Sequence, residues 1–156
     1  MALVRILVDG YSLLHDWPEL APGKARHSAA AREELVRMLT QYGDACGTPI
    51  TIVFDAADAP PGTPKLPSTP EIEVLYSGAG QTADQMIERA ACRLRAYGEV
   101  LVVTDDNAER ETVAAFGAMA SSCENFIRTV EGELVDFQRQ LKHHNRRERQ
   151  SYSRTS

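Results

Sequence analysis

Short apolar runs alternate along this chain with longer segments in which apolar residues recur at helical spacing. The runs are rich in β-branched residues, and most lack strict alternation, which is typical of strands covered on both faces of a parallel sheet. The predicted strands are residues 3–8, 50–55, 71–76 and 100–104. The predicted helices are residues 28–44, 82–97, 108–116 and 122–145.

The alternation of strands and helices predicts one three-layer α/β/α domain with a mainly parallel central sheet, covering residues 1–145. Ser28 and Thr82 are the expected N-caps of the first two helices. Gln85 stands where a capping box with Thr82 needs it. Residues 56–70 contain five prolines, and we expect an extended loop there.

The chain of 156 residues has a net charge of −5, but its charges are unevenly distributed. Residues 1–138 hold 11 Lys and Arg against 21 Asp and Glu, whereas residues 139–156 hold 6 against 1. Residues 146–156 are therefore expected to form a basic, flexible tail, in which Arg146 and Arg147 are candidate contacts to RNA phosphates. A solvated terminus that only aids solubility is the alternative.

No apolar run approaches the roughly 20 residues that a membrane-spanning helix needs, so we expect no membrane association. The apolar stretch at the N-terminus is interrupted by Asp9, which indicates a strand rather than a signal peptide. The three cysteines are far apart and form no CxxC pair. This pattern indicates free thiols in a reducing cytoplasm and disfavours a zinc site.

Acidic residues directly follow three of the predicted strands. Asp9 follows the first strand, Asp55 the second and the pair Asp105–Asp106 the fourth, while Asp84 lies in the first turn of the second helix. Because open parallel sheets bind ligands at the carboxyl ends of their strands, these acids are expected to meet there. A divalent cation would offset their repulsion, and oxygen ligands without matching His or Cys favour Mg²⁺ or Mn²⁺.

Each of these acids also has a structural interpretation. Asp at a helix start is commonly an N-cap, so either Asp105 or Asp106 could cap the following helix while the other binds metal. Asp55 could simply cap the turn before the proline-rich loop. Glu88, one helical turn after Asp84, could be a further ligand or an exposed partner of nearby arginines.

Five sequence segments occur in the order VDGYSLLHDWPEL, AREEL, VFDA, QTADQMIE and VVTDDNAER. Together they resemble the YacP-like branch of the NYN domain family, a group of PIN-like nucleases, over about residues 4–137. The resemblance implies a PIN-like fold and a metal-dependent endoribonuclease, and bacterial members look like ribosome-associated mRNA endonucleases. By the match of their motifs, Asp9, Asp84 and Asp106 would be the catalytic, metal-binding acids. Asp105, which directly follows the fourth predicted strand, is a further candidate metal ligand.

The chain departs from the family motifs at three positions. Ser12 stands where the family has Asn, Gln81 where it has Glu, and Asp105 where it has Ser. The number of acids is roughly kept while their layout changes. The candidate supporting residues are Ser12, Asp55, Glu88 and Asn107.

Trp17 and Arg32 are further candidate contacts to RNA. Trp17 could stack on a base, or it could fill the edge of the core. Arg32 lies near the start of the first predicted helix, where it could meet a phosphate or pair with the neighbouring Glu33 or Glu34.

The sequence thus predicts a cytoplasmic metal-dependent endoribonuclease that cleaves RNA phosphodiester bonds, with the ribosome as a candidate partner. The alternative is a non-catalytic RNA- or ribosome-binding module, which the changes at Ser12 and Gln81 would suit. A phosphatase of the haloacid dehalogenase type is disfavoured, because Tyr11 stands where that family needs a second Asp. The pattern predicts no particular oligomeric state.

Overall fold

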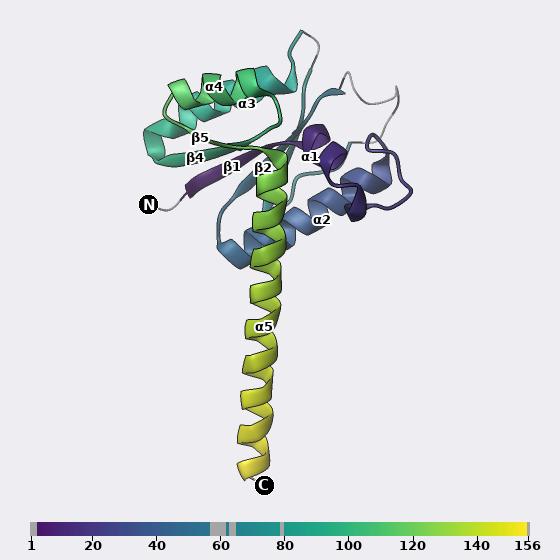
Figure 1. Ribbon diagram of the computed structural model, residues 1–156, viewed down its shortest axis with the longest axis vertical. Helices are drawn as coiled ribbons and strands as arrows, with labels where there is room; N and C mark the ends of the chain where they lie inside the picture. The colour runs from purple at the N-terminus through teal and green to yellow at the C-terminus, as the bar shows by residue number, and fades with distance from the viewer. Residues whose placement is uncertain (1–2, 57–61, 63–64, 79, 156) are drawn as a thin grey trace.

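The computed structural model describes residues 3–56, 62, 65–78 and 80–155. A five-stranded parallel sheet lies at its centre, with the strand order β3-β2-β1-β4-β5 (Figure 1). Its strands are β1 (Leu3–Asp9), β2 (Ile50–Phe54), β3 (Ile72–Tyr76), β4 (Glu99–Val103) and β5 (Met119–Ser121). The α-helices are α1 (Gly10–Asp16), α2 (Ala29–Cys46), α3 (Ala83–Leu94), α4 (Asn107–Ala115) and α5 (Cys123–Thr155).

Helices cover both faces of the sheet, which confirms the predicted three-layer α/β/α architecture. On one face, Ile6 and Val8 of β1 share a buried cluster with Leu35 of α2 and Phe126 of α5, and residues of α1 complete it. On the other face, Leu7 of β1 belongs to a second buried cluster with residues of α3 and α4. Neighbouring residues of β1 therefore pack into two separate cores, as a strand covered on both sides requires.

The predicted N-terminal caps of α2 and α3 are confirmed. The Ser28 hydroxyl accepts a hydrogen bond from the backbone N–H of Ala31 at 3.1 Å. Thr82 and Gln85 form the capping box, each side chain accepting from the backbone N–H of the other at 3.1 Å. This box fixes where α3 begins, and it therefore positions Asp84 in the first turn of that helix.

Two short elements, α1 and β5, are not predicted by the sequence pattern. Helix α1 starts at Gly10 with no loop after β1, and a Cβ at this position would collide with the Phe54 ring. Glycine is therefore needed for the chain to turn so close to β2. Strand β5 has three residues, of which Met119 and Ala120 are exposed, so it lacks the apolar run that marks the other strands.

Helix α5 continues to Thr155, beyond the predicted end at about residue 145, so the expected basic tail is helical through most of its length. Its first turns pack against the domain through the buried Phe126 and Val130, and the rest projects away from the sheet (Figure 1). The segment has no Gly or Pro stop signal near residue 145, and a charged sequence is compatible with either helix or coil. Neither α5 nor any other helix among the described residues is long and apolar enough to cross a membrane.

The proline-rich segment 56–70 is described in part. Residues 65–70 form neither helix nor strand, as expected for a loop, while residues 57–61 and 63–64 lie outside the described residues. The backbone N–H of Leu66 donates to the Tyr76 hydroxyl at 2.9 Å, which ties the end of the loop to β3.

Candidate active site

The carboxyl ends of β1 and β4 form the switch point of the sheet, because β2 and β3 lie on one side of β1 while β4 and β5 lie on the other. Open parallel sheets bind ligands in the crevice at this position. A cavity of about 410 Å³ here is lined by five aspartates, which are Asp9, Asp55, Asp84, Asp105 and Asp106. The structure therefore brings to one cavity the acids that the strand ends and motifs single out.

Asp84 and Asp106 form a compact group with Glu109 of α4, which the motifs do not single out. Carboxylate oxygens of these three residues lie within 4.8 Å of one another. Asp106 is also the N-cap of α4, and its Oδ1 accepts a hydrogen bond from the backbone N–H of Ala108 at 2.9 Å. Asp106, rather than Asp105, is thus the cap, and it belongs to the acidic group at the same time.

Glu109 is only 1% exposed, and no N–H or hydroxyl group among the described residues donates a hydrogen bond to either of its carboxylate oxygens. Burial raises the pKa of Glu109 to about 10, and the adjacent carboxylate of Asp84 adds to this effect. A buried carboxylate beside other carboxylates is costly in free energy unless a proton or a cation neutralises it. Three carboxylates are a donor set that Mg²⁺ or Mn²⁺ accepts, so Asp84, Asp106 and Glu109 fit a divalent metal ion.

Asp9 is held in the same cavity by Ser12. The Ser12 hydroxyl donates to Asp9 Oδ2 at 2.9 Å and the Ser12 backbone N–H donates to Oδ1 at 3.4 Å, so Asp9 caps α1. Burial raises the pKa of Asp9 and outweighs the opposing hydrogen bonds from Ser12, with a further upward contribution from the carboxylates of Asp84 and Asp55. Ser12 therefore orients this acid although it is shorter than the Asn of the family motif.

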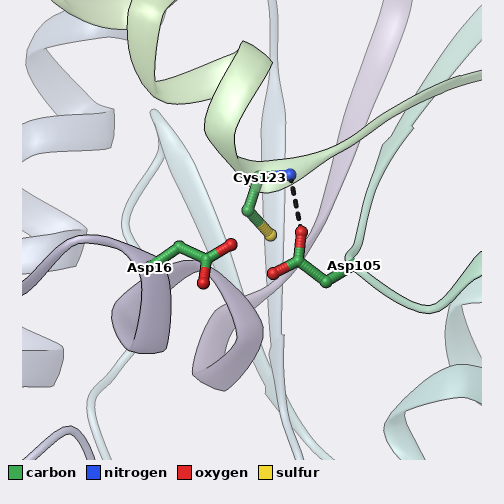
Figure 2. Close-up of side chains that lie close together, drawn as sticks. All are labelled: Asp16, Asp105 and Cys123. Atoms are coloured by element: carbon green, nitrogen blue, oxygen red, sulfur yellow. Dashed lines mark hydrogen bonds between the residues drawn. The ribbon is translucent and has the colours of Figure 1, made fainter.

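A second group forms where Asp105 approaches the end of α1 and the start of α5 (Figure 2). Asp105 Oδ1 accepts a hydrogen bond from the backbone N–H of Cys123 at 3.0 Å, and ligand atoms of Asp16, Asp105 and Cys123 lie within 4.8 Å of one another. Burial disfavours the charged form of Asp105, but hydrogen bonds with Asp16 and Cys123 outweigh it and lower the pKa of Asp105. The hydrogen bond with Asp105 raises the pKa of Asp16 to about 6. Each of the two acidic groups could hold a divalent metal.

The other supporting candidates lie around this centre. Asp55 lines the acidic cavity and accepts a hydrogen bond from the Ser77 hydroxyl at 3.1 Å. Asn107 is the exposed first residue of α4 and accepts a hydrogen bond from Arg110. Glu88 is a half-buried residue of α3 that lines a neighbouring hollow instead. Asp55 is thus the member of this set that lines the cavity.

Two candidate RNA contacts prove to be buried. Arg32 is fully buried in α2, where its guanidinium donates to the backbone carbonyl of His27 at 2.8 Å and to the Tyr11 hydroxyl at 3.4 Å. Trp17 is 4% exposed and belongs to the core beneath α1 and α2. Neither side chain can contact RNA in this structure, which corrects the prediction for both, and Trp17 takes the alternative role of filling the core.

The basic candidates Arg146 and Arg147 lie on the projecting part of α5 (Figure 1). Both are exposed, and so are Arg139 and Lys142 closer to the domain. This part of the helix therefore presents basic side chains to solvent in a regular arrangement.

Glu109 and Asp16 are site residues that the motifs do not reveal. Glu109 follows Asp106 by three residues, a spacing that places both on one side of the first turn of α4. This spacing is the sequence feature from which Glu109 could be predicted as a site residue. Asp16 ends a helix that the pattern does not predict, so nothing in the sequence places it near Asp105.

Comparison with known proteins identifies the family of this chain. The sequence model of the YacP-like NYN domain matches residues 6–156. The chain belongs to the YacP-like NYN domain family. Members of this family have a nuclease-like, RNA-related fold, and the acidic groups described above suit such a fold.

YacP itself comes from Bacillus subtilis (strain 168) and is 32% identical to this chain over 127 residues, which cover 81% of this chain and 74% of YacP. The crystal structure of Rae1 (YacP) from Bacillus subtilis superposes with a TM-score of 0.77 at 27% identity, covering 97% of this chain and 86% of that one. A crystal structure of a mutant of the same protein gives a TM-score of 0.75 at 27% identity, with coverages of 90% and 82%. These similarities confirm the predicted fold and the resemblance to the family.

Proposed function

We propose that this protein is a metal-dependent endoribonuclease that uses Mg²⁺ or Mn²⁺ to hydrolyse RNA phosphodiester bonds. The observation that carries the proposal is the buried carboxyl group of Glu109, which lies beside the carboxylates of Asp84 and Asp106 and receives no hydrogen bond from an N–H or hydroxyl group of the described residues. A hard divalent cation is the natural counterpart of such a group. Membership of a nuclease-like family supports the same chemistry.

The proposed roles follow from the positions of the side chains. Asp84, Asp106 and Glu109 would hold the metal ion. When bound, such an ion polarises the phosphodiester and lowers the pKa of a water molecule. Asp9 is fixed by Ser12 in the same cavity, and its raised pKa makes its carboxylate a stronger base, so Asp9 would accept the proton that the attacking water loses.

We further propose messenger RNA as the substrate, the cytoplasm as the place of action and the ribosome as a candidate partner. The exposed arginines Arg146 and Arg147 on α5 support a contact with nucleic acid. Each phosphate contact of an Arg or Lys releases counterions, so binding through this helix would weaken steeply with salt.

A non-catalytic RNA- or ribosome-binding module is the second candidate function, and Gln81, which stands where the family motif has Glu, favours it. In such a module the basic side chains of α5 would carry the affinity, and RNA binding would survive the loss of Asp9. Ser12 nevertheless donates two hydrogen bonds to Asp9, so this departure keeps the acid in place and supports the enzyme instead.

Removal of divalent metal tests the proposed function directly. We expect the full chain to cut a labelled messenger RNA internally with Mg²⁺ or Mn²⁺, and to become at least about 100-fold slower in EDTA, because the metal supplies several kcal/mol of transition-state stabilisation. Excess Mn²⁺ should restore the rate, and added ribosomes test the candidate partner in the same assay. Undiminished cleavage in EDTA, or no cleavage of RNA with either metal, would contradict the proposal.

A further inference from the structure

Three arginines line a second hollow, on the face of the sheet that α3 covers. This hollow has a volume of about 490 Å³ and is lined by Arg5 of β1 together with Arg89 and Arg93 of α3; we call it the arginine hollow. Guanidinium groups bind phosphates and apolar surfaces accept the faces of bases, so this combination matches a nucleotide chain. The apolar side chains of the lining are Leu7, Val53, Leu75, Met86, Ala90 and Leu94.

Two of these arginines are available to bind an anion. Arg89 and Arg93 are exposed and one helical turn apart, and neither has an ion-pair or hydrogen-bond partner in the part of the chain that the structure describes. Arg5 is held in place, because its guanidinium donates to the Thr51 hydroxyl at 3.0 Å. The Thr51 hydroxyl in turn donates to Glu73, the acid of this lining, at 3.0 Å. The arginine hollow is therefore a basic patch on an otherwise acidic domain.

A series of adjoining hollows connects the arginine hollow with the acidic cavity. Thr82 lines both the acidic cavity and the hollow next to it, and Gln81 lines that hollow and the arginine hollow. Helix α3 spans the same interval, with Asp84 in its first turn and Arg89 and Arg93 further along. At a rise of 1.5 Å per residue, the two arginines lie about 8 and 14 Å beyond Asp84 along the helix axis.

We propose that the arginine hollow binds the phosphate backbone of single-stranded RNA on one side of the bond that is cleaved in the acidic cavity. This inference rests on the proposed function, because it names a second contact for the same RNA. Carboxylates without a cation repel phosphates, so the acidic cavity contributes little affinity of its own. Guanidinium groups further along α3 supply the missing attraction and fix the direction in which the strand enters the cavity.

The test compares a double variant of the hollow, Arg89→Gln with Arg93→Gln, with a matched control, Lys24→Gln with Arg37→Gln. The control removes two exposed basic side chains outside the arginine hollow and outside α5, one from α2 and one from the loop before it. The probe is a fluorescein-labelled single-stranded RNA of 12 nucleotides, and its anisotropy is measured in EDTA at several salt concentrations. We expect the hollow variant to bind about tenfold more weakly and to lose about 1.4 from the slope of log K against log salt, at about 0.7 per phosphate contact. The control should bind as the native chain does.

Cleavage of the same RNA with Mn²⁺ separates this inference from the proposed function. If the native chain cleaves the RNA but the hollow variant binds it unchanged, or no more weakly than the control does, the hollow inference fails and the proposed function stands. If the native chain binds RNA without cleaving it and only the hollow variant loses affinity, the hollow is supported and the nuclease is overturned. Native protein that neither binds the RNA in EDTA nor cleaves it with Mn²⁺ would overturn both.

Discussion

Replacing Asp84 by Asn is expected to slow RNA cleavage by about 10³-fold. The Asp84 carboxylate belongs to one group with Asp106 and Glu109, and an amide cannot supply the negative charge that holds a cation there. A bound metal contributes several kcal/mol of transition-state stabilisation, and each 1.4 kcal/mol or so corresponds to a factor of ten in rate. Single-turnover cleavage of a labelled RNA at a fixed Mn²⁺ concentration measures the loss.

Two further variants show whether the effect belongs to the acidic group. Asp106→Asn should be impaired to a similar extent without losing the cap of α4, because Asn and Asp are comparable N-caps. Glu111→Gln is the matched control, since this exposed acid lies on the same helix as Glu109 but outside the acidic group. Native rates in Asp84→Asn and Asp106→Asn would rule out this group as the catalytic centre.

Glu109→Gln is expected to stabilise the metal-free protein, and to do so more strongly as the pH rises. Burial raises the pKa of Glu109 from 4.5 to about 10 in the folded protein. A carboxyl with a raised pKa contributes its full stability below the ordinary value and loses that contribution as the pH rises towards the folded-state value. The native chain should therefore lose about 3 kcal/mol of unfolding free energy between pH 4.5 and 7, which the glutamine variant keeps. Urea unfolding in EDTA at pH 5, 7 and 9 measures this difference.

Excess Mn²⁺ should reverse the order of stability of the two proteins. A cation stabilises the native Glu109 carboxylate, whereas the neutral amide of the glutamine variant provides a weaker ligand. Glu111→Gln again serves as the control, and its stability should follow that of the native chain at each pH. An identical pH dependence for the native chain and Glu109→Gln, with or without Mn²⁺, would show that Glu109 is not part of a cation site.

The long, strongly patterned elements of this fold are predictable from the sequence because their signals are local. Strands β1, β2 and β4 are apolar runs, and α3 begins at a capping box that two side chains specify. Helix α1 depends instead on a contact between distant segments, because its start at Gly10 requires the space beside Phe54 of β2. The sequence pattern of residues 10–16 does not indicate that contact.

The sequence predicts only those residues of the candidate site that the sheet topology and the start of α3 bring together. Parallel strands bring Asp9 and Asp106 to one edge, and the α3 cap brings Asp84 there. The approach of Glu109 to Asp84 depends on how α3 and α4 pack together, which sequence spacing does not specify. Arg32 shows the reverse case, because a charged residue near a helix start is expected at the surface, whereas tertiary hydrogen bonds satisfy it in the core.

An anomalous-scattering measurement on crystals grown with Mn²⁺ tests the central claim most directly. We predict a peak among the carboxylates of Asp84, Asp106 and Glu109, and its loss in crystals of Asp84→Asn under the same conditions. The opposite finding would be no peak among these three side chains at a Mn²⁺ concentration that supports RNA cleavage.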